Sequence, residues 1–123
     1  MIVGHLDGDD IGSPLELMLL DNNLDDASKY SHSVAQALRY MREFFEKRSL
    51  EVIVCGGDDL VACWDEGSIT DEDIEFIRNR YYELCGRTLS VGLGRSPSDA
   101  TCNLRRAKLR GKNQVVSDSR AQT

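Results

Sequence analysis

Closely spaced cysteine pairs and long apolar runs are both lacking in this sequence, and each absence narrows the classes of protein that it can belong to. The four cysteines, at positions 55, 63, 85 and 102, lie far apart and form no Cys-x-x-Cys pair, which argues against a zinc ribbon or a dense disulfide framework. The apolar stretches fall far short of the ~20 residues that a membrane helix requires, and no basic segment followed by an apolar one opens the chain. We therefore expect a cytoplasmic protein with no membrane partner.

Basic charge is also in short supply. The 123 residues include 15 Lys and Arg against 21 Asp and Glu, which gives a formal net charge of −6. Such a surface repels a nucleic-acid backbone, so we expect no direct nucleic-acid partner, and a phosphate ligand would need a local basic site or metal ions. Hydrophobic residues at 41% and charged residues at 29% are typical of one globular domain.

Hydrophobic spacing and turn residues predict an alternation of strands and helices. Strands are expected at 1–6, 50–55, 60–64, 88–93 and 114–116, and helices at 15–20, 25–48, 70–86 and 96–111. This order favours an α+β fold of the ferredoxin-like kind, an antiparallel sheet with helices packed on one face. We expect a domain over residues 1–116 and a disordered tail over 117–123.

Two acidic clusters stand at predicted strand ends: Asp7, Asp9 and Asp10 after the first strand, and Asp58 and Asp59 in the hairpin. In a ferredoxin-like sheet the first strand is central, and we expect it beside strand 50–55, so that the clusters meet at one edge. Carboxylates ~4 Å apart repel by ~4 kcal/mol at an effective dielectric near 20, so cations should accompany them. Oxygen ligands favour Mg²⁺ or Mn²⁺, and two such ions could clamp a nucleoside triphosphate.

The glycines of these clusters suggest separate roles. Gly56 and Gly57 permit a tight hairpin and a close approach of phosphate to the backbone, while Gly8 leaves its carbonyl open to a metal next to the first carboxylate. Either cluster alone could be a solvated acidic turn. An EF-hand is rejected, because Ile11 and Met18 occupy two of its ligand positions.

A basic stripe follows on the last predicted helix. Arg105, Lys108 and Lys112 recur at i, i+3 and i+7, which puts them on one helix face where they could hold a triphosphate. An ordinary solvated basic face is the alternative. His5 should share a strand face with Asp7 and could line the site, although a histidine hydrogen-bonded within the sheet is the commoner arrangement.

Four segments together resemble the palm-type nucleotidyl cyclases, namely GGDEF domains and the polymerase domain of the large CRISPR effector subunit. They are DGD at 7–9, GGDD at 56–59, SVGLG at 90–94 and AKLRGKNQV at 107–115. A chain of this length with DGDDIG and CGGDDL is most similar to the minimal CRISPR polymerases. The resemblance implies a palm domain in which Asp7, the Gly8 carbonyl and Asp58 hold metal, and we expect Asp59 to join them in holding two Mg²⁺ or Mn²⁺ ions. It also implies that Lys108 and Lys112 contact phosphates. The other expected nucleotide and phosphate contacts are Asp9, Asp10, Ile11, Gly12, Gly56, Gly57 and Arg105.

Two departures from the GGDEF pattern bear on the substrate. The hairpin is GGDD, which favours adenylate chemistry. Leu15 stands where diguanylate cyclases carry their guanine-binding asparagine, which argues against guanine selectivity. The resemblance therefore implies that Asp58 and Asp59 catalyse the joining of two ATP molecules into cyclic di-AMP with loss of pyrophosphate, a signal in bacterial anti-phage defence read by a downstream effector. Because one palm holds one nucleotide, we expect a homodimer. The alternatives are a linear or longer cyclic oligoadenylate synthase and a silent palm that only binds nucleotide.

Overall fold

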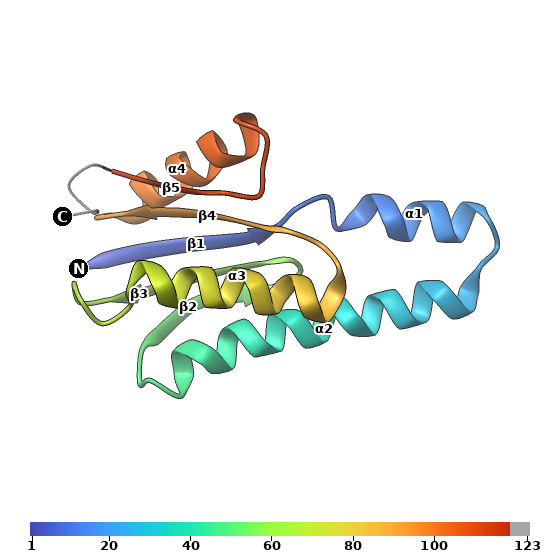
Figure 1. The fold of residues 1–123 in the computed structure, drawn as a ribbon, viewed down its shortest axis with the longest axis horizontal. Helices are drawn as coiled ribbons and strands as arrows, with labels where there is room; N and C mark the ends of the chain where they lie inside the picture. The colour runs from blue at the N-terminus through green and yellow to red at the C-terminus, as the bar shows by residue number, and fades with distance from the viewer. Residues whose placement is uncertain (119–123) are drawn as a thin grey trace.

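The computed structural model describes residues 1–118, and these form an α+β fold, as predicted (Figure 1). The elements follow one another as β1 (Ile2–Gly8), α1 (Gly12–Leu20), α2 (Leu24–Glu46), β2 (Glu51–Gly56), β3 (Asp59–Trp64), α3 (Asp71–Cys85), β4 (Leu89–Gly94), α4 (Pro97–Leu109) and β5 (Val115–Ser117). Every predicted strand and helix is present. β5 includes Ser117, the first residue assigned to the tail, whereas residues 119–123 of that prediction lie outside the described residues.

The sheet has the strand order β2-β3-β1-β4-β5. β1 is central, as expected, but its neighbours are β3 and β4, both antiparallel to it; the expectation that β1 lies beside strand 50–55 is wrong. β5 pairs with β4 in parallel, so the sheet is mixed, not wholly antiparallel. The physical reason is that α4 carries the chain back across the sheet before β5 begins, and such a crossover returns the next strand in the same direction.

Helices cover both faces of the sheet, which corrects the prediction of helices on one face. Leu89, Val91 and Leu93 of β4 belong to the core that α2 and α3 close, so the intervening residues of this strand point the other way. There a Cβ on Gly92 would lie 2.1 Å from the carbonyl oxygen of Ala100 in α4. The glycine therefore allows α4 to pack directly on the backbone of β4.

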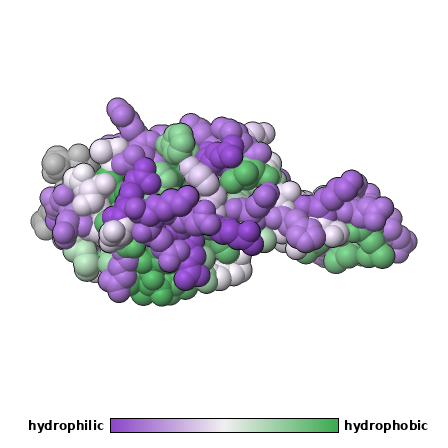
Figure 2. All heavy atoms as spheres, turned by 90° about the horizontal axis from the view of Figure 1, so that it is seen from below, coloured by the Kyte–Doolittle hydropathy of each residue, from purple (hydrophilic) through white to green (hydrophobic). Residues whose placement is uncertain are grey.

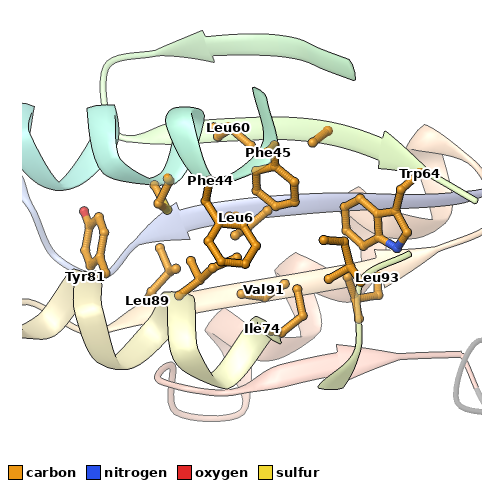
Figure 3. Packing of buried hydrophobic residues seen from close by; sticks show 14 of the residues in the cluster. Leu6, Phe44, Phe45, Leu60, Trp64, Ile74, Tyr81, Leu89, Val91 and Leu93 are labelled. Carbon is orange, nitrogen blue, oxygen red and sulfur yellow. The ribbon is translucent and has the colours of Figure 1, made fainter. Parts of the chain in front are cut away.

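The main core lies between the sheet and the pair α2–α3 (Figure 3). Phe45 of α2 stacks on Trp64 of β3 with ring centroids 5.5 Å apart, and Leu6 of the central strand is fully buried beneath them. At the opposite end of the same layer, Tyr81 of α3 is 1% exposed and approaches the last residues of β1. The core thus fixes where β1 ends, which is where the first acidic cluster begins.

Local sequence signals set the ends of α3 and α4. The predicted capping box of α3 is present, since Thr70 and Asp73 each accept a hydrogen bond from the other's backbone N–H. Ser96 caps α4 with Pro97 in its first turn. α4 ends at Leu109, two residues before the predicted Gly111, because the chain turns there into a left-handed loop.

α1 and the start of α2 project beyond the end of the sheet as a helical arm (Figures 1 and 2). α1 starts at Gly12, three residues before the predicted start, and it buries none of its own residues. Within residues 1–118, no helix is both long enough and apolar enough to cross a membrane.

Candidate active site

The two acidic clusters meet at one end of the sheet, as predicted. Asp7 of β1 stands directly opposite Asp59 of β3 in the antiparallel register. Next to this pair, the backbone N–H of Gly8 donates to the carbonyl oxygen of Asp58 at 3.0 Å. The clusters meet through β3, the second strand of the hairpin.

Lys108 of α4 lies among the oxygens of the first cluster. Its Nζ is 3.0 Å from Asp7 Oδ2, 3.0 Å from the Gly8 carbonyl oxygen and 2.7 Å from Asp9 Oδ1. Burial raises the pKa of Asp7, and the charges of Asp58 and Asp59 act in the same direction, although Lys108 opposes them. The pKa of Lys108 is itself raised, because its carboxylate partners outweigh its burial. A cation is therefore held among oxygen atoms here.

Asp9 has a different position from Asp7. It is 2% exposed, and each carboxylate oxygen accepts two hydrogen bonds. Oδ1 accepts from Ser90 Oγ and Lys108 Nζ, both at 2.7 Å; Oδ2 accepts from Thr88 Oγ1 at 2.7 Å and from the Asn113 N–H at 3.0 Å. Burial opposes ionisation, but these donors together lower the pKa of Asp9. With its oxygens so occupied, Asp9 connects β1 to β4, α4 and the α4–β5 loop.

Lys112 reaches the same loop from the other side. Gly111, Lys112 and Asn113 all have positive φ, at 115°, 65° and 52°, a conformation that costs energy for residues other than glycine. The turn directs the Asn113 N–H at Asp9 and pairs Lys112 with the carboxylate of exposed Asp10. Lys112 lowers the pKa of Asp10. The last basic residue of the predicted stripe therefore does reach the acidic loop.

Packing explains why Gly8 and Ile11 stand at these positions, and the sequence did not predict this. A Cβ on Gly8 would lie 2.3 Å from the Tyr81 hydroxyl and 2.7 Å from the Ile11 side chain, so only glycine fits. Ile11 packs against the core, and its carbonyl accepts a 2.6 Å hydrogen bond from Tyr30. Both residues therefore shape the loop that carries Asp9 and Asp10.

His5 holds Asp59 against α4. Its Nε2 is 2.9 Å from Asp59 Oδ2, and its Nδ1 is 3.1 Å from Thr101 Oγ1. Both ring nitrogens have partners, so the structure has the sheet-bonded histidine that was the commoner alternative. The bond also fixes one carboxylate oxygen of Asp59 beside the open end of the site.

Other predicted residues stay outside this network. Arg105 is exposed, and in the described chain its guanidinium has no hydrogen-bond or ion-pair partner, so the structure does not bring it to the acidic loop. Gly12, Gly56 and Gly57 border open space, and Gly57 has the positive φ expected of the hairpin turn. Asp58 is exposed at that turn.

Three residues of the network were not among the predicted site residues. Thr88 and Ser90 both hold Asp9, and the Arg87 Nε donates to the Asp9 carbonyl at 3.2 Å. A weak signal was available, because Thr88 and Ser90 are polar residues two positions apart at the start of β4, where the alternate residues are apolar. That spacing turns both hydroxyls to one face.

The oxygen donors fit a hard cation, but in the described residues no three His, Cys, Asp or Glu side chains converge as a ready metal site. Carboxylate and backbone oxygens are the ligands that Mg²⁺ and Mn²⁺ prefer. The ammonium of Lys108 is surrounded by such oxygens, from Asp7, Gly8 and Asp9. A divalent ion could use part of this set only after Lys108 moves away.

Comparisons with known proteins agree with this geometry. A family model described as the minimal CRISPR polymerase domain matches residues 3–117. No curated protein matches the chain. Solved structures of similar fold include the GGDEF domain of DgcB from Caulobacter crescentus in complex with c-di-GMP, with 17% identity, a TM-score of 0.65, and coverage of 99% of this chain and 78% of that one.

Two further solved structures share the fold. The Csm1–Csm4 cassette in complex with cA4 has 23% identity and a TM-score of 0.61, and the match covers 95% of this chain but 20% of that one. The active GGEEF domain of a diguanylate cyclase from Vibrio cholerae has 16% identity, a TM-score of 0.58, and coverage of 94% and 81%. This chain thus spans a fifth of the Csm1–Csm4 chain that it matches and most of each GGDEF-type domain.

Proposed function

The chain belongs to the minimal CRISPR polymerase family, and we propose that it condenses two ATP molecules into cyclic di-AMP. Its fold is that of nucleotide cyclases and polymerases of the palm type. The observation that carries the proposal is the meeting of Asp7 and Asp59 across β1 and β3, with Lys108 and Lys112 directed at the same strand end.

The proposed reaction is two in-line displacements. A ribose hydroxyl of one ATP attacks the α-phosphorus of the other, the new P–O bond replaces the bond to pyrophosphate, and the hydroxyl proton leaves. Repetition with the roles exchanged closes the ring, so two pyrophosphates leave per ring. Lys108 and Lys112 would neutralise the triphosphate as negative charge moves onto the leaving pyrophosphate.

We propose Asp7, Asp58, Asp59 and the Gly8 carbonyl as the groups that would hold two Mg²⁺ or Mn²⁺ ions. When bound, such ions supply charge neutralisation at the phosphates and help to ionise the attacking hydroxyl. Lys108 would set the order of binding. It lies against Asp7 and Asp9 without nucleotide, and a bound triphosphate would attract its ammonium more strongly than these carboxylates do. Transfer of the lysine to phosphate would leave the oxygens of Asp7 and Gly8 open.

The choice of adenine, the dimer and the biological role belong to the same proposal. Leu15 stands where guanine-selective relatives carry an asparagine, and an apolar side chain cannot donate to a guanine edge. One palm positions one triphosphate, so two copies with facing sites are proposed to close the ring. The product would act in the cytoplasm on a downstream effector in anti-phage defence.

Product analysis tests the proposal directly. Purified protein is mixed with ATP and Mg²⁺ or Mn²⁺, and the products are identified by mass spectrometry and nuclease digestion. We expect cyclic di-AMP from the wild type and none from Asp58→Ala. Larger rings or linear chains would instead establish an oligoadenylate synthase. Identical products from both proteins, or none from the wild type, would reject the enzyme.

Lys108 also gives one observation that favours a second candidate, a palm that binds nucleotide without turning it over. Its ammonium already neutralises the carboxylates of Asp7 and Asp9, and a site that only binds nucleotide would need no catalytic metal ions in its place. Thermal stabilisation of the wild type by ATP, with no product at any metal concentration, would favour this candidate.

A further inference from the structure

The projecting arm, residues 12–26, presents leucines to solvent. Leu17, Leu20 and Leu24 are 59%, 72% and 72% exposed. Figure 2 shows apolar side chains gathered along one side of the projection. Among the elements α1 contacts only α2, so the described residues leave this surface uncovered. Apolar side chains that gather on an exposed helix, and that folding does not use, are typical of an interaction surface.

The charge of the arm restricts its partner. Residues 12–26 contain four acidic side chains, Glu16, Asp21, Asp25 and Asp26, and no lysine or arginine. An anionic membrane or a nucleic acid would be repelled, and so would the same arm of another copy. The partner surface that would complement the arm is therefore an apolar side chain bordered by basic side chains.

This chain carries such a surface at the outer end of α4. Leu109 is 74% exposed, and Arg105 and Arg110 lie exposed beside it. In the described part of the chain neither guanidinium has an ion-pair partner. We name these three residues the α4 patch. Its apolar and basic groups complement the apolar and acidic groups of the arm.

Both surfaces lie at the end of the sheet that carries the site. The arm begins at Gly12, directly after the loop of Asp9 and Asp10, and the neighbour of Leu109 in sequence, Lys108, contacts that same loop. Figure 1 shows α1 running outward from this end, away from the α4 of its own chain. A second copy that turns its own site end toward the first would place its α4 patch beside the arm.

We propose that the arm of each copy docks on the α4 patch of a second copy, so that a two-fold dimer has two reciprocal arm–patch contacts. The inference rests on the homodimer of the proposed function and names the surfaces that form it. In this dimer Arg105 would pair with the acidic arm of the second copy and not with the phosphate predicted from the sequence.

A charge-swap experiment tests the pairing. The arm variant is Glu16→Lys with Asp21→Lys, and the patch variant is Arg105→Glu with Arg110→Glu; all four side chains are exposed, so folding should be preserved, as circular dichroism can verify. Masses are measured by light scattering after size exclusion, with and without ATP. We expect a wild-type dimer and two monomeric variants. A mixture of the two variants should give a heterodimer, because one of its contacts joins the new lysines to the new glutamates and the other is the wild-type contact.

Leucine variants test the apolar half of the contact. Leu20→Gln with Leu24→Gln should raise the dimer dissociation constant at least roughly tenfold per leucine, as expected for an apolar side chain that loses its burial. Two controls change exposed residues elsewhere: Glu72→Lys on α3 and Ile53→Gln, 53% exposed on the edge strand β2. Both should remain dimers.

Three results would overturn the inference: a wild type that is monomeric at every concentration, arm and patch variants that remain dimers, or a mixture that forms no heterodimer. If only Ile53→Gln lost the dimer, the interface would lie at the β2 edge of the sheet, and the arm–patch contact would also be rejected. Mass needs no turnover, so a wild-type dimer that makes no cyclic product, together with variants that behave as expected, would reject the proposed function and leave this inference intact.

Discussion

Replacement of Asp9 by asparagine should destabilise the fold far more than the same change at the adjacent Asp10. The Asp9 carboxylate accepts four hydrogen bonds in a buried position. The asparagine amide has one oxygen that can accept two of them, and its NH₂ group faces the other two donors and cannot accept from them. Loss of about two charge-assisted bonds costs about 3–5 kcal/mol. For a domain of this size, that lowers the Tm by roughly 10–20 °C.

Urea unfolding measures this cost. Trp64 is the single tryptophan, is 5% exposed and stacks on Phe45, so its fluorescence reports the loss of the core. Asp10→Asn is the matched control, since it removes an equal charge from an exposed side chain. An Asp9→Asn protein within 1 kcal/mol of the wild type, or equal to the control, would refute the reasoning that the four donors hold this carboxylate.

The pH dependence gives an independent check on the same residue. The native pKa of Asp9 lies below its ordinary value of 3.8, so ionised Asp9 contributes stability that is present above pH 3.8 and lost as the pH falls through the native pKa. The difference in unfolding free energy between the wild type and Asp9→Asn should therefore be constant from pH 7 to about pH 5 and shrink only in stronger acid. A difference that vanishes by pH 6 would contradict this assignment.

Three further substitutions have expected outcomes. Gly8→Ala should destabilise the protein strongly, because its Cβ has no room, whereas Gly12→Ala, which borders open space, should not; thermal unfolding compares them. Gly92→Ala should displace α4 from the sheet and lower the Tm, again relative to Gly12→Ala, and an equal Tm would be the contrary result. Asp7→Asn should raise the stability at neutral pH in metal-free buffer. The native pKa of Asp7 is raised, so its ionisation costs native stability as the pH rises through that pKa. The variant should also make no product, and a loss of stability would contradict the reasoning.

Helix ends were predictable because their causes lie within a few residues. Thr70 and Asp73 form the capping box of α3 from adjacent turns of one chain segment, and Ser96 with Pro97 does the equivalent for α4. α1 was predicted too short because its start lacks such a signal: Ile11 precedes it with no side-chain cap.

The arrangement of the sheet was less accessible to sequence reasoning. A pattern of apolar residues shows that β1 is a strand but does not name its neighbours, and the assumed neighbour was the wrong strand of the hairpin. The second helical layer did have a signal. Gly92 and Gly94 alternate with the core residues of β4, and a strand face made of glycine is typical of close packing against a helix.

The separate roles of the three aspartates of the first cluster could not be predicted. Asp7, Asp9 and Asp10 are chemically identical, and the groups that bury Asp9 lie 79–104 residues further along the chain. Only the fold decides that Asp9 turns inward to these donors while Asp10 remains exposed. The sequence thus predicted that the two acidic clusters meet, but it grouped a connecting carboxylate with those expected to bind ligands.

The charge argument for metal ions also changes with the structure. Gathered carboxylates do require cations, but the described residues supply them: Lys108 pairs with Asp7 and Asp9, and Lys112 pairs with Asp10. Repulsion among the acidic residues therefore no longer demands a divalent ion. The case for two ions now depends on family membership and on the oxygen donors around Lys108.

This leads to a prediction about competition between Lys108 and metal. If the ammonium and a divalent ion use the same oxygens of Asp7 and Gly8, then Lys108→Met should bind Mn²⁺ more tightly than the wild type does in the absence of ATP. Calorimetry or electron paramagnetic resonance of Mn²⁺ measures this without turnover. In the wild type, ATP should tighten Mn²⁺ binding, since the triphosphate draws Lys108 away, and the methionine variant should show less of that coupling. Equal Mn²⁺ affinity in both proteins without ATP would mean that the lysine and the ion occupy different oxygens.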